Sequence, residues 1–217
     1  MNKLFLFDMD GVLIDTERVW HSRGNEFMLG MFGADITAKI GSPLGLTAKA
    51  IFEKGQAHGF TKSYEYFKDA LDAAAESVYH VAPITPGVET LAQFLIDSGF
   101  KIGLVSSSGP KWIGWVLPRL SFAKNIEHII SLNERTDLRP KPHPDGYQEA
   151  INVLGGSPAT TIILEDSNTG IKAAMASGAF TIAFRQNLVD GYQQIDASER
   201  AETMHEVMGI VRKHLFN

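Results

Sequence analysis

Short apolar runs of the kind that form buried strands alternate along most of this chain with stretches of helical spacing. Each run ends in a polar turn, and the stretches between the runs carry apolar residues three or four positions apart. Strands separated by helices pair in parallel, with helices on both faces of the sheet. The sequence therefore predicts a doubly wound α/β core. The predicted strands are residues 4–7, 102–105, 128–130, 161–164 and 180–183.

One long segment interrupts this alternation. Residues 16–83 contain no strand-like run, and their apolar residues follow helical spacing, as Trp20, Phe27 and Met31 do. A segment of this length is too long for one crossover between strands. We therefore predict a small α-helical cap domain at residues 16–83, inserted into a core domain of residues 1–15 and 84–217.

The composition limits the chemistry that is available. The chain has no cysteine, which excludes disulfides, thiolate metal sites and cysteine nucleophiles, so a metal must bind oxygen or histidine. Its 20 Lys and Arg against 25 Asp and Glu give a formal charge of −5 without a long basic run, so we expect no nucleic acid partner. Neither a signal peptide nor a transmembrane run is recognisable, so we expect a cytoplasmic protein without a membrane partner. The sequence does not indicate the oligomeric state.

Two aspartates directly follow the first predicted strand. Asp8 and Asp10 lie two positions apart, so in an extended chain they point the same way, at the strand end where open α/β sheets bind ligands. Carboxylates ~4 Å apart repel by about 4 kcal/mol at an effective dielectric of about 20, so either a cation lies between them or one is protonated. An Asp-Gly turn is the alternative. A calcium loop is excluded, because Val12 and Leu13 stand where an oxygen ligand and a glycine are needed.

Two later segments have features of an anion site. Ser106, Ser107 and Ser108 follow the second predicted strand and open a helix, where backbone N–H groups and hydroxyls bind anions; an ordinary helix cap is the alternative. Lys141 stands between two prolines, which fix the backbone and lower the entropy lost when the ammonium meets a phosphate. A rigid exposed linker would explain the prolines but not the lysine.

The fourth predicted strand ends in Glu165 and Asp166, which adds acidic groups at a second carboxyl end. Capping of the next helix by Asp166 or Ser167 is the alternative. Hard oxygen donors suit Mg²⁺, and the serines and the lysine suit the remaining oxygens of a phosphate. Taken together, these segments predict a magnesium site that binds a phosphoryl group.

The chain resembles the haloacid dehalogenase superfamily, in the branch with a helical cap after the first strand. The resemblance spans essentially the whole chain and depends on four motifs in order. They are residues 7–16 (Phe-Asp-Met-Asp-Gly-Val-Leu-Ile-Asp-Thr), 105–107 (Val-Ser-Ser), 141–145 (Lys-Pro-His-Pro-Asp) and 164–170 (Leu-Glu-Asp-Ser-Asn-Thr-Gly). The resemblance implies a Rossmann-like core and a phosphatase for a small phosphorylated metabolite, such as a sugar phosphate.

The resemblance also implies roles for the acidic residues. Asp8 would attack phosphorus to form an aspartyl phosphate, and Asp10 would protonate the leaving oxygen and later activate water. Asp8, Asp166 and the backbone carbonyl of Asp10 would hold Mg²⁺, with Glu165 as a supporting carboxylate.

The phosphoryl group would be bound by Ser106 and Lys141, with the Ser107 amide as a helper. On the same basis we expect a low pKa for Asp8 beside Mg²⁺ and Lys141, whereas Asp10 must hold a proton during part of the cycle.

Asp10 also separates phosphatases from other members of the superfamily. Dehalogenating members lack this second carboxylate and phosphonate-cleaving members carry a small residue there, so both are disfavoured. A sugar phosphomutase is the main alternative, but such members hold a second phosphate with an arginine at the position of Leu44, and only Lys39 is cationic in residues 39–47. A phospho-aspartate signalling domain is an alternative from another class, and the cap and Asp10 argue against it.

Overall fold

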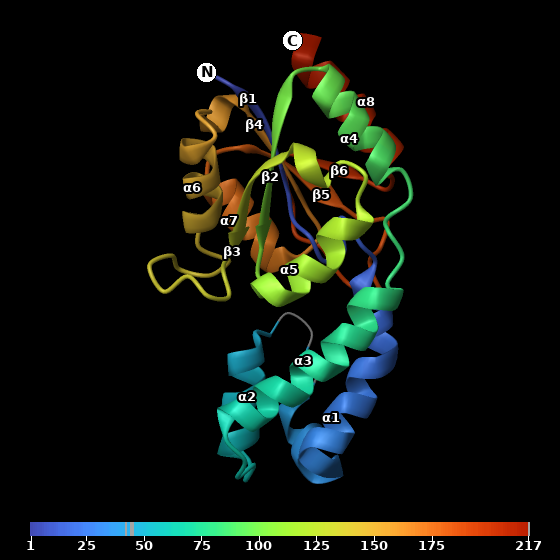
Figure 1. Cartoon of the computed structure of the whole chain (residues 1–217), viewed down its shortest axis with the longest axis vertical. Helices are drawn as coiled ribbons and strands as arrows, with labels where there is room; N and C mark the ends of the chain where they lie inside the picture. Colours follow the sequence, from blue (N-terminus) through green and yellow to red (C-terminus); the bar gives the residue numbers. More distant parts are fainter. Residues whose placement is uncertain (42, 44–45, 217) are drawn as a thin grey trace.

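A six-stranded parallel sheet forms the centre of the molecule (Figure 1). We describe it from a computed structural model that covers residues 1–41, 43 and 46–216. The strand order is β3-β2-β1-β4-β5-β6, so the direction of winding reverses between β1 and β4. The strands are β1 Lys3–Phe7, β2 Phe100–Ser106, β3 Ile126–Ser131, β4 Thr161–Glu165, β5 Phe180–Phe184 and β6 Glu199–Ala201.

Five of the strands match the predicted runs, and β6 was missed. β6 has only three residues, two of them exposed, so it lacks the apolar run that marks a buried strand. Helices connect the strands. They are α1 Thr16–Ile40, α2 Ala48–Ala57, α3 Tyr64–Val81, α4 Val88–Asp97, α5 Pro110–Val116, α6 Asp145–Val153, α7 Asn168–Ala176 and α8 Met204–Phe216, with the 3₁₀ helices η1 Leu117–Arg119, η2 Ala123–Asn125 and η3 Pro158–Thr160.

Helices cover both faces of the sheet, and β1 shows how the sequence divides between them. Phe5 and Phe7 pack in a cluster with apolar residues of α4, α5 and α8. Leu4 and Leu6 alternate with them and pack on the other face, against α6 and α7. This arrangement confirms the predicted doubly wound α/β fold.

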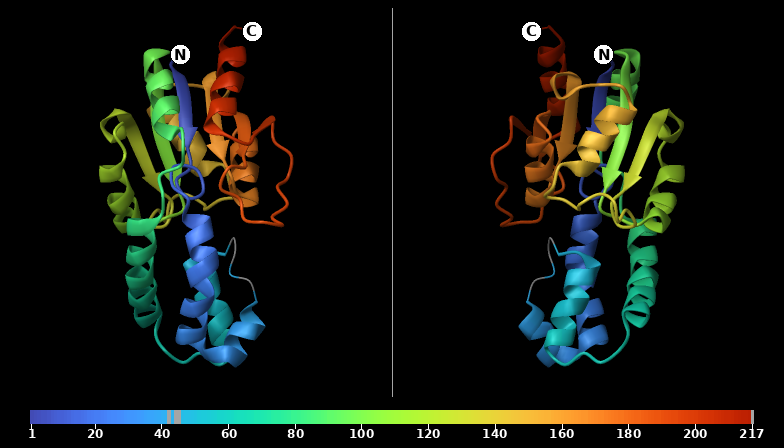
Figure 2. Two further views of the ribbon diagram at one scale, coloured as in Figure 1. Left: turned by 90° about the vertical axis from the view of Figure 1, so that its right-hand side faces the viewer. Right: turned by 90° about the vertical axis from the view of Figure 1, so that its left-hand side faces the viewer.

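Helices α1, α2 and α3 lie together at the carboxyl end of the strands, opposite the two termini (Figure 2). They bury an apolar cluster of their own, which we call the cap cluster; it consists of Met28, Phe32, Ile40, Phe52, Phe60, Phe67 and Leu71. The inserted helical segment is therefore confirmed. The proposed boundaries of the two domains stay a prediction.

The two connections between this segment and the sheet run side by side. Asp15 N donates a hydrogen bond to Pro83 O at 2.9 Å, and Ile14 forms a β-bridge with Ile84. The segment that leads into the helices and the segment that leads back to the sheet are thus hydrogen-bonded to each other next to the end of β1. Among the residues described, no helix combines the length and the apolar character needed to cross a membrane.

Two helical glycines provide a matched test of the cap cluster. A Cβ on Gly55 of α2 would lie 2.5 Å from the ring of Phe32, whereas a Cβ on Gly30 of α1 would meet nothing within 4 Å. We expect Gly55→Ala to lower the free energy of unfolding by about 1–3 kcal/mol through overpacking. Gly30→Ala should raise it by about 0.5–1 kcal/mol, because alanine favours the helix. Denaturant unfolding followed by tryptophan fluorescence measures both, and changes of the same sign would contradict the packing described.

Candidate active site

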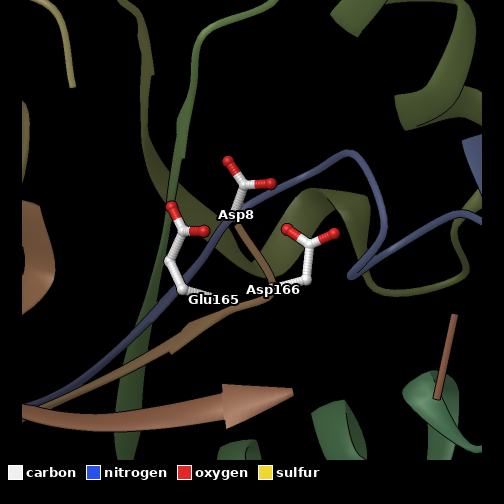
Figure 3. A group of neighbouring side chains, drawn as sticks. All are labelled: Asp8, Glu165 and Asp166. Atoms are coloured by element: carbon white, nitrogen blue, oxygen red, sulfur yellow. The ribbon is translucent and has the colours of Figure 1, made fainter. Parts of the chain in front are cut away.

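Three carboxylates meet at the carboxyl ends of two neighbouring strands. Asp8 follows β1, and Glu165 and Asp166 lie at the end of β4, which pairs with β1 in parallel. Each residue offers one oxygen within 4.8 Å of the others, and all three are buried. Figure 3 shows the three side chains on the same side of the two chain segments. The sequence predicted acidic groups at the carboxyl ends of these two strands, but not that the strands are neighbours.

Lys141 neutralises part of this charge. Its Nζ lies 2.6 Å from Oδ1 of Asp8 and 2.5 Å from Oε1 of Glu165, with only 5% of the lysine side chain exposed. Burial lowers the pKa of Lys141, but Asp8 and Glu165 together raise it above its ordinary value. The ammonium therefore stays charged, and one positive charge is shared by two of the three carboxylates.

The three carboxylates differ in how far the protein itself satisfies them. Oε1 of Glu165 also accepts a hydrogen bond from Tyr147 at 2.6 Å, and Oε2 accepts bonds from the amide and hydroxyl of Ser167. Within the described part of the chain, Oδ2 of Asp8 and both carboxylate oxygens of Asp166 accept no hydrogen bond. Asp8 and Asp166 are thus the carboxylates with oxygens available to a cation, and these hard donors fit a divalent metal.

Burial raises the pKa of Asp8 well above its ordinary value; Lys141 opposes this, while Glu165 and Asp10 add to it. Burial likewise raises the pKa of Asp166, with repulsion from Asp8 and Glu165. The low pKa expected for Asp8 beside Mg²⁺ stays a prediction, whereas without a metal burial outweighs the single lysine and the pKa is raised. A divalent cation beside these oxygens would act in the opposite direction.

The Asp10 side chain lies outside this cluster, although it is partly buried close by. Its Oδ1 accepts hydrogen bonds from the hydroxyls of Thr16 at 2.8 Å and Tyr79 at 2.7 Å, and its Oδ2 accepts one from Ser108 at 2.6 Å. Sequence reasoning identified none of these three partners, and it also missed Tyr147. Ser108 and Thr16 adjoin recognised motifs, but Tyr79 lies 69 residues from Asp10, and nothing in the spacing of α3 marks it.

The predicted serines behave differently from one another. Ser106 is fully buried at the end of β2, where its hydroxyl accepts a hydrogen bond from the amide of Ser108 at 3.0 Å. Ser107 is exposed. None of these serines caps α5, whose N-cap is Gly109, although Pro110 occupies the first turn as the helix-cap alternative expects. Capping is correct for Ser167, whose hydroxyl accepts from the amide of Gly170.

Two glycines allow the backbone to approach the acidic cluster. A Cβ on Gly11 would lie 1.9 Å from Oδ2 of Asp166, and Gly11 has a φ of +74° that disfavours other residues. A Cβ on Gly170 would lie 1.9 Å from Oε1 of Glu165. The loop after β1 and the start of α7 therefore require glycine in order to pack against the carboxylates.

The sheet order, the inserted helices and the acidic cluster define a Rossmann-like α/β enzyme with a helical insertion. The chain belongs to the haloacid dehalogenase-like hydrolase family, whose sequence profile matches residues 5–184. This confirms the superfamily that the four motifs indicated and confirms that the chain is an enzyme.

Individual relatives are similar over most of their length. Hexitol phosphatase B of Escherichia coli (strain K12) is 28% identical over 79% of this chain and 78% of its own. Pyrophosphatase PpaX of Anoxybacillus flavithermus is 26% identical over 96% of this chain and 97% of its own. Among solved structures, a haloacid dehalogenase hydrolase of family IA, variant 3, from Entamoeba histolytica has a TM-score of 0.80 at 19% identity and covers 100% of both chains. That structure shares the fold.

Glu17, in the first turn of α1, adds a further negative charge near the cluster. Burial raises its pKa from 4.5 to about 7, and Asp10 and Asp15 contribute repulsion. The pKa of Glu17 is higher in the folded protein than in the unfolded one, so protonation of its carboxyl favours the folded state. This contribution to the free energy of unfolding is complete below pH 4.5 and is lost as the pH rises through about 7. We expect Glu17→Gln to raise the free energy of unfolding of the metal-free protein by about 1–3 kcal/mol above this window.

The same substitution should have almost no effect on stability at the acid end of the window. Denaturant unfolding with a chelator at several pH values measures the difference. Glu65→Gln is the matched control, because Glu65 occupies the first turn of α3 but is exposed. A Glu17→Gln effect that does not change with pH would contradict the stated cause.

Proposed function

We propose that this chain is a Mg²⁺-dependent phosphatase that hydrolyses a small phosphorylated metabolite through an aspartyl phosphate on Asp8. The observation that carries the proposal is the buried cluster of Asp8, Glu165 and Asp166 beside Lys141. Family membership and the phosphatase relatives support a phosphatase-type function. The proposal adds three assignments to this: Mg²⁺ as the metal, the aspartyl phosphate as the intermediate and a small phosphorylated metabolite as the substrate.

Asp8 is the proposed nucleophile. Its carboxylate forms a bond to phosphorus while the bond from phosphorus to the leaving oxygen breaks, and that oxygen takes a proton from Asp10. In the second step a water molecule returns a proton to Asp10 as its oxygen attacks phosphorus, which releases phosphate and restores Asp8. Lys141 holds Asp8 in place and, with Ser106 and the Ser107 amide, is proposed to bind the phosphoryl oxygens.

We assign the Mg²⁺ ligands to Asp8, Asp166 and the backbone carbonyl of Asp10. Glu165 is proposed as a supporting carboxylate, which agrees with its hydrogen bonds to Lys141 and Tyr147. When bound, Mg²⁺ would neutralise negative charge on the phosphoryl oxygens.

Helices α1, α2 and α3 are proposed to form a cap, at residues 16–83, that excludes bulk water and selects the substrate. Sugar phosphates, polyol phosphates, sugar acid phosphates and nucleotides are candidate substrates. The name of hexitol phosphatase B favours testing phosphorylated hexitols first, and that of PpaX adds pyrophosphate. Cytoplasmic localisation belongs to the proposal.

The test is phosphate release from a panel of such compounds, with Mg²⁺ and with a chelator. We expect release by the wild type only with Mg²⁺. Asp8→Asn should lower kcat by about 10³-fold or more, because it removes the nucleophile but preserves the shape of the side chain. Asp97→Asn is a suitable control, since Asp97 is exposed at the end of α4 and should leave turnover near that of the wild type. Release that survives Asp8→Asn would contradict the proposal.

Product analysis separates hydrolysis from the mutase alternative. Phosphorus NMR should show free phosphate rather than movement of phosphate between positions of one sugar. Leu44, the residue on which the sequence comparison with mutases depends, lies outside the described residues. Little free phosphate together with an isomerised sugar phosphate would favour the mutase.

A further inference from the structure

Three hydroxyl groups from three separate elements surround the Asp10 carboxylate. Thr16 begins α1, Tyr79 lies in the last turns of α3, and Ser108 follows β2. The two hydroxyl oxygens of Tyr79 and Ser108 also lie 3.0 Å apart, so these two and Asp10 form a closed ring of contacts in which both hydroxyl protons are donated to Asp10. A closed ring fixes the rotation of the carboxylate as well as its position.

Tyr79 lies in α3, a helix of the proposed cap, but its side chain is fixed by contacts with the core. Its side chain is 1% exposed and packs in the cluster on the sheet, not in the cap cluster. Its ring lies 5.3 Å from that of Trp112 and 6.2 Å from that of Trp115, both in α5. Arg119 donates hydrogen bonds to the backbone carbonyls of Tyr79 and Ala82. Packing of its ring and hydrogen bonds to its main chain therefore both hold the Tyr79 hydroxyl against Asp10.

The hydrogen bonds distinguish the two oxygens of Asp10. A carboxylate oxygen has about two lone pairs that accept hydrogen bonds. Thr16 and Tyr79 occupy both on Oδ1, whereas Ser108 occupies one on Oδ2. Within the described part of the chain, Oδ2 is the oxygen with a remaining site for a proton.

We propose that Tyr79 is a positioning residue that orients the Asp10 carboxylate and leaves Oδ2 to exchange the proton with the substrate. This inference rests on the proposed phosphatase function. The proton leaves Oδ2 for the leaving oxygen as the bond from phosphorus to that oxygen breaks, and it is replaced from the attacking water. Tyr79 does not touch the substrate, and its contribution comes entirely through Asp10.

The nature of the leaving group separates this role from a purely structural one. An alkoxide leaving group needs the proton, whereas a nitrophenolate departs readily without it. Tyr79→Phe keeps the ring that packs on Trp112 and removes only the hydroxyl. Asp10 also serves the second step, which is common to all substrates, so the comparison uses kcat/KM, which covers only the steps up to loss of the leaving group. We expect kcat/KM to fall about tenfold for an alkyl phosphate and at most about twofold for p-nitrophenyl phosphate.

Two further variants sharpen the test. In an Asp10→Asn background, Tyr79→Phe should cause no additional loss with the alkyl phosphate, because its effect passes through Asp10. Ser108→Ala, which removes another member of the ring, should show the same dependence on the leaving group and provides a second test if Tyr79→Phe does not fold. Tyr66→Phe is the matched control, since Tyr66 lies in the same helix with 52% of its surface exposed.

The outcomes distinguish this inference from the proposed function. If the wild type releases phosphate from no compound of the panel and not from p-nitrophenyl phosphate, the proposed function fails and the inference fails with it. If the wild type releases phosphate but Tyr79→Phe lowers kcat/KM equally for both substrates, or lowers it further in the Asp10→Asn background, only the role of Tyr79 is overturned.

Discussion

The pairing of Lys141 with Asp8 and Glu165 is the interaction on which the rest of the site depends. Three carboxylates are buried at the ends of β1 and β4, and only one buried ammonium faces them among the described residues. Removing such charges from water is costly unless they are paired, so the cluster has excess negative charge that protons or a cation must balance. Burial, together with repulsion among these carboxylates, raises the pKa of Asp8 and of Asp166. A divalent cation would offset it, and this links the electrostatics of the fold to the proposed chemistry.

The structure also keeps the two proposed reacting carboxylates in separate surroundings. Asp8 lies with the acidic cluster and a lysine, whereas the partners that donate hydrogen bonds to Asp10, two residues later, are all neutral hydroxyls among the residues described. Separate surroundings allow two identical side chains to perform different tasks, one as nucleophile and one as carrier of a proton. Because Tyr79 reaches Asp10 from the helical segment, the environment of the proposed acid is completed only when α3 is packed on the core.

Much of this arrangement could be predicted from local sequence. The alternation of strands and helices indicated the fold, and the acidic residues after two runs indicated the strand ends at which the cluster lies. That β1 and β4 are neighbours in the sheet is not contained in the local pattern. β6 escaped prediction because it is short and largely exposed. Tyr79 was not predicted as a partner of Asp10, because this contact joins residues 69 positions apart and the periodicity within α3 does not reveal it. The raised pKa of Asp8 could not be anticipated without the depth of burial and the count of neighbouring charges.

The most direct test of the central claim is to trap the intermediate on Asp8. The enzyme would be mixed with Mg²⁺ and its best substrate, quenched in acid during turnover and reduced with borohydride, which converts an acyl phosphate of aspartate to homoserine. Peptide mass spectrometry then locates the change. Our account predicts homoserine at position 8, and none there when substrate is omitted. Rapid phosphate release with an unmodified Asp8, or modification at another carboxylate, would contradict it.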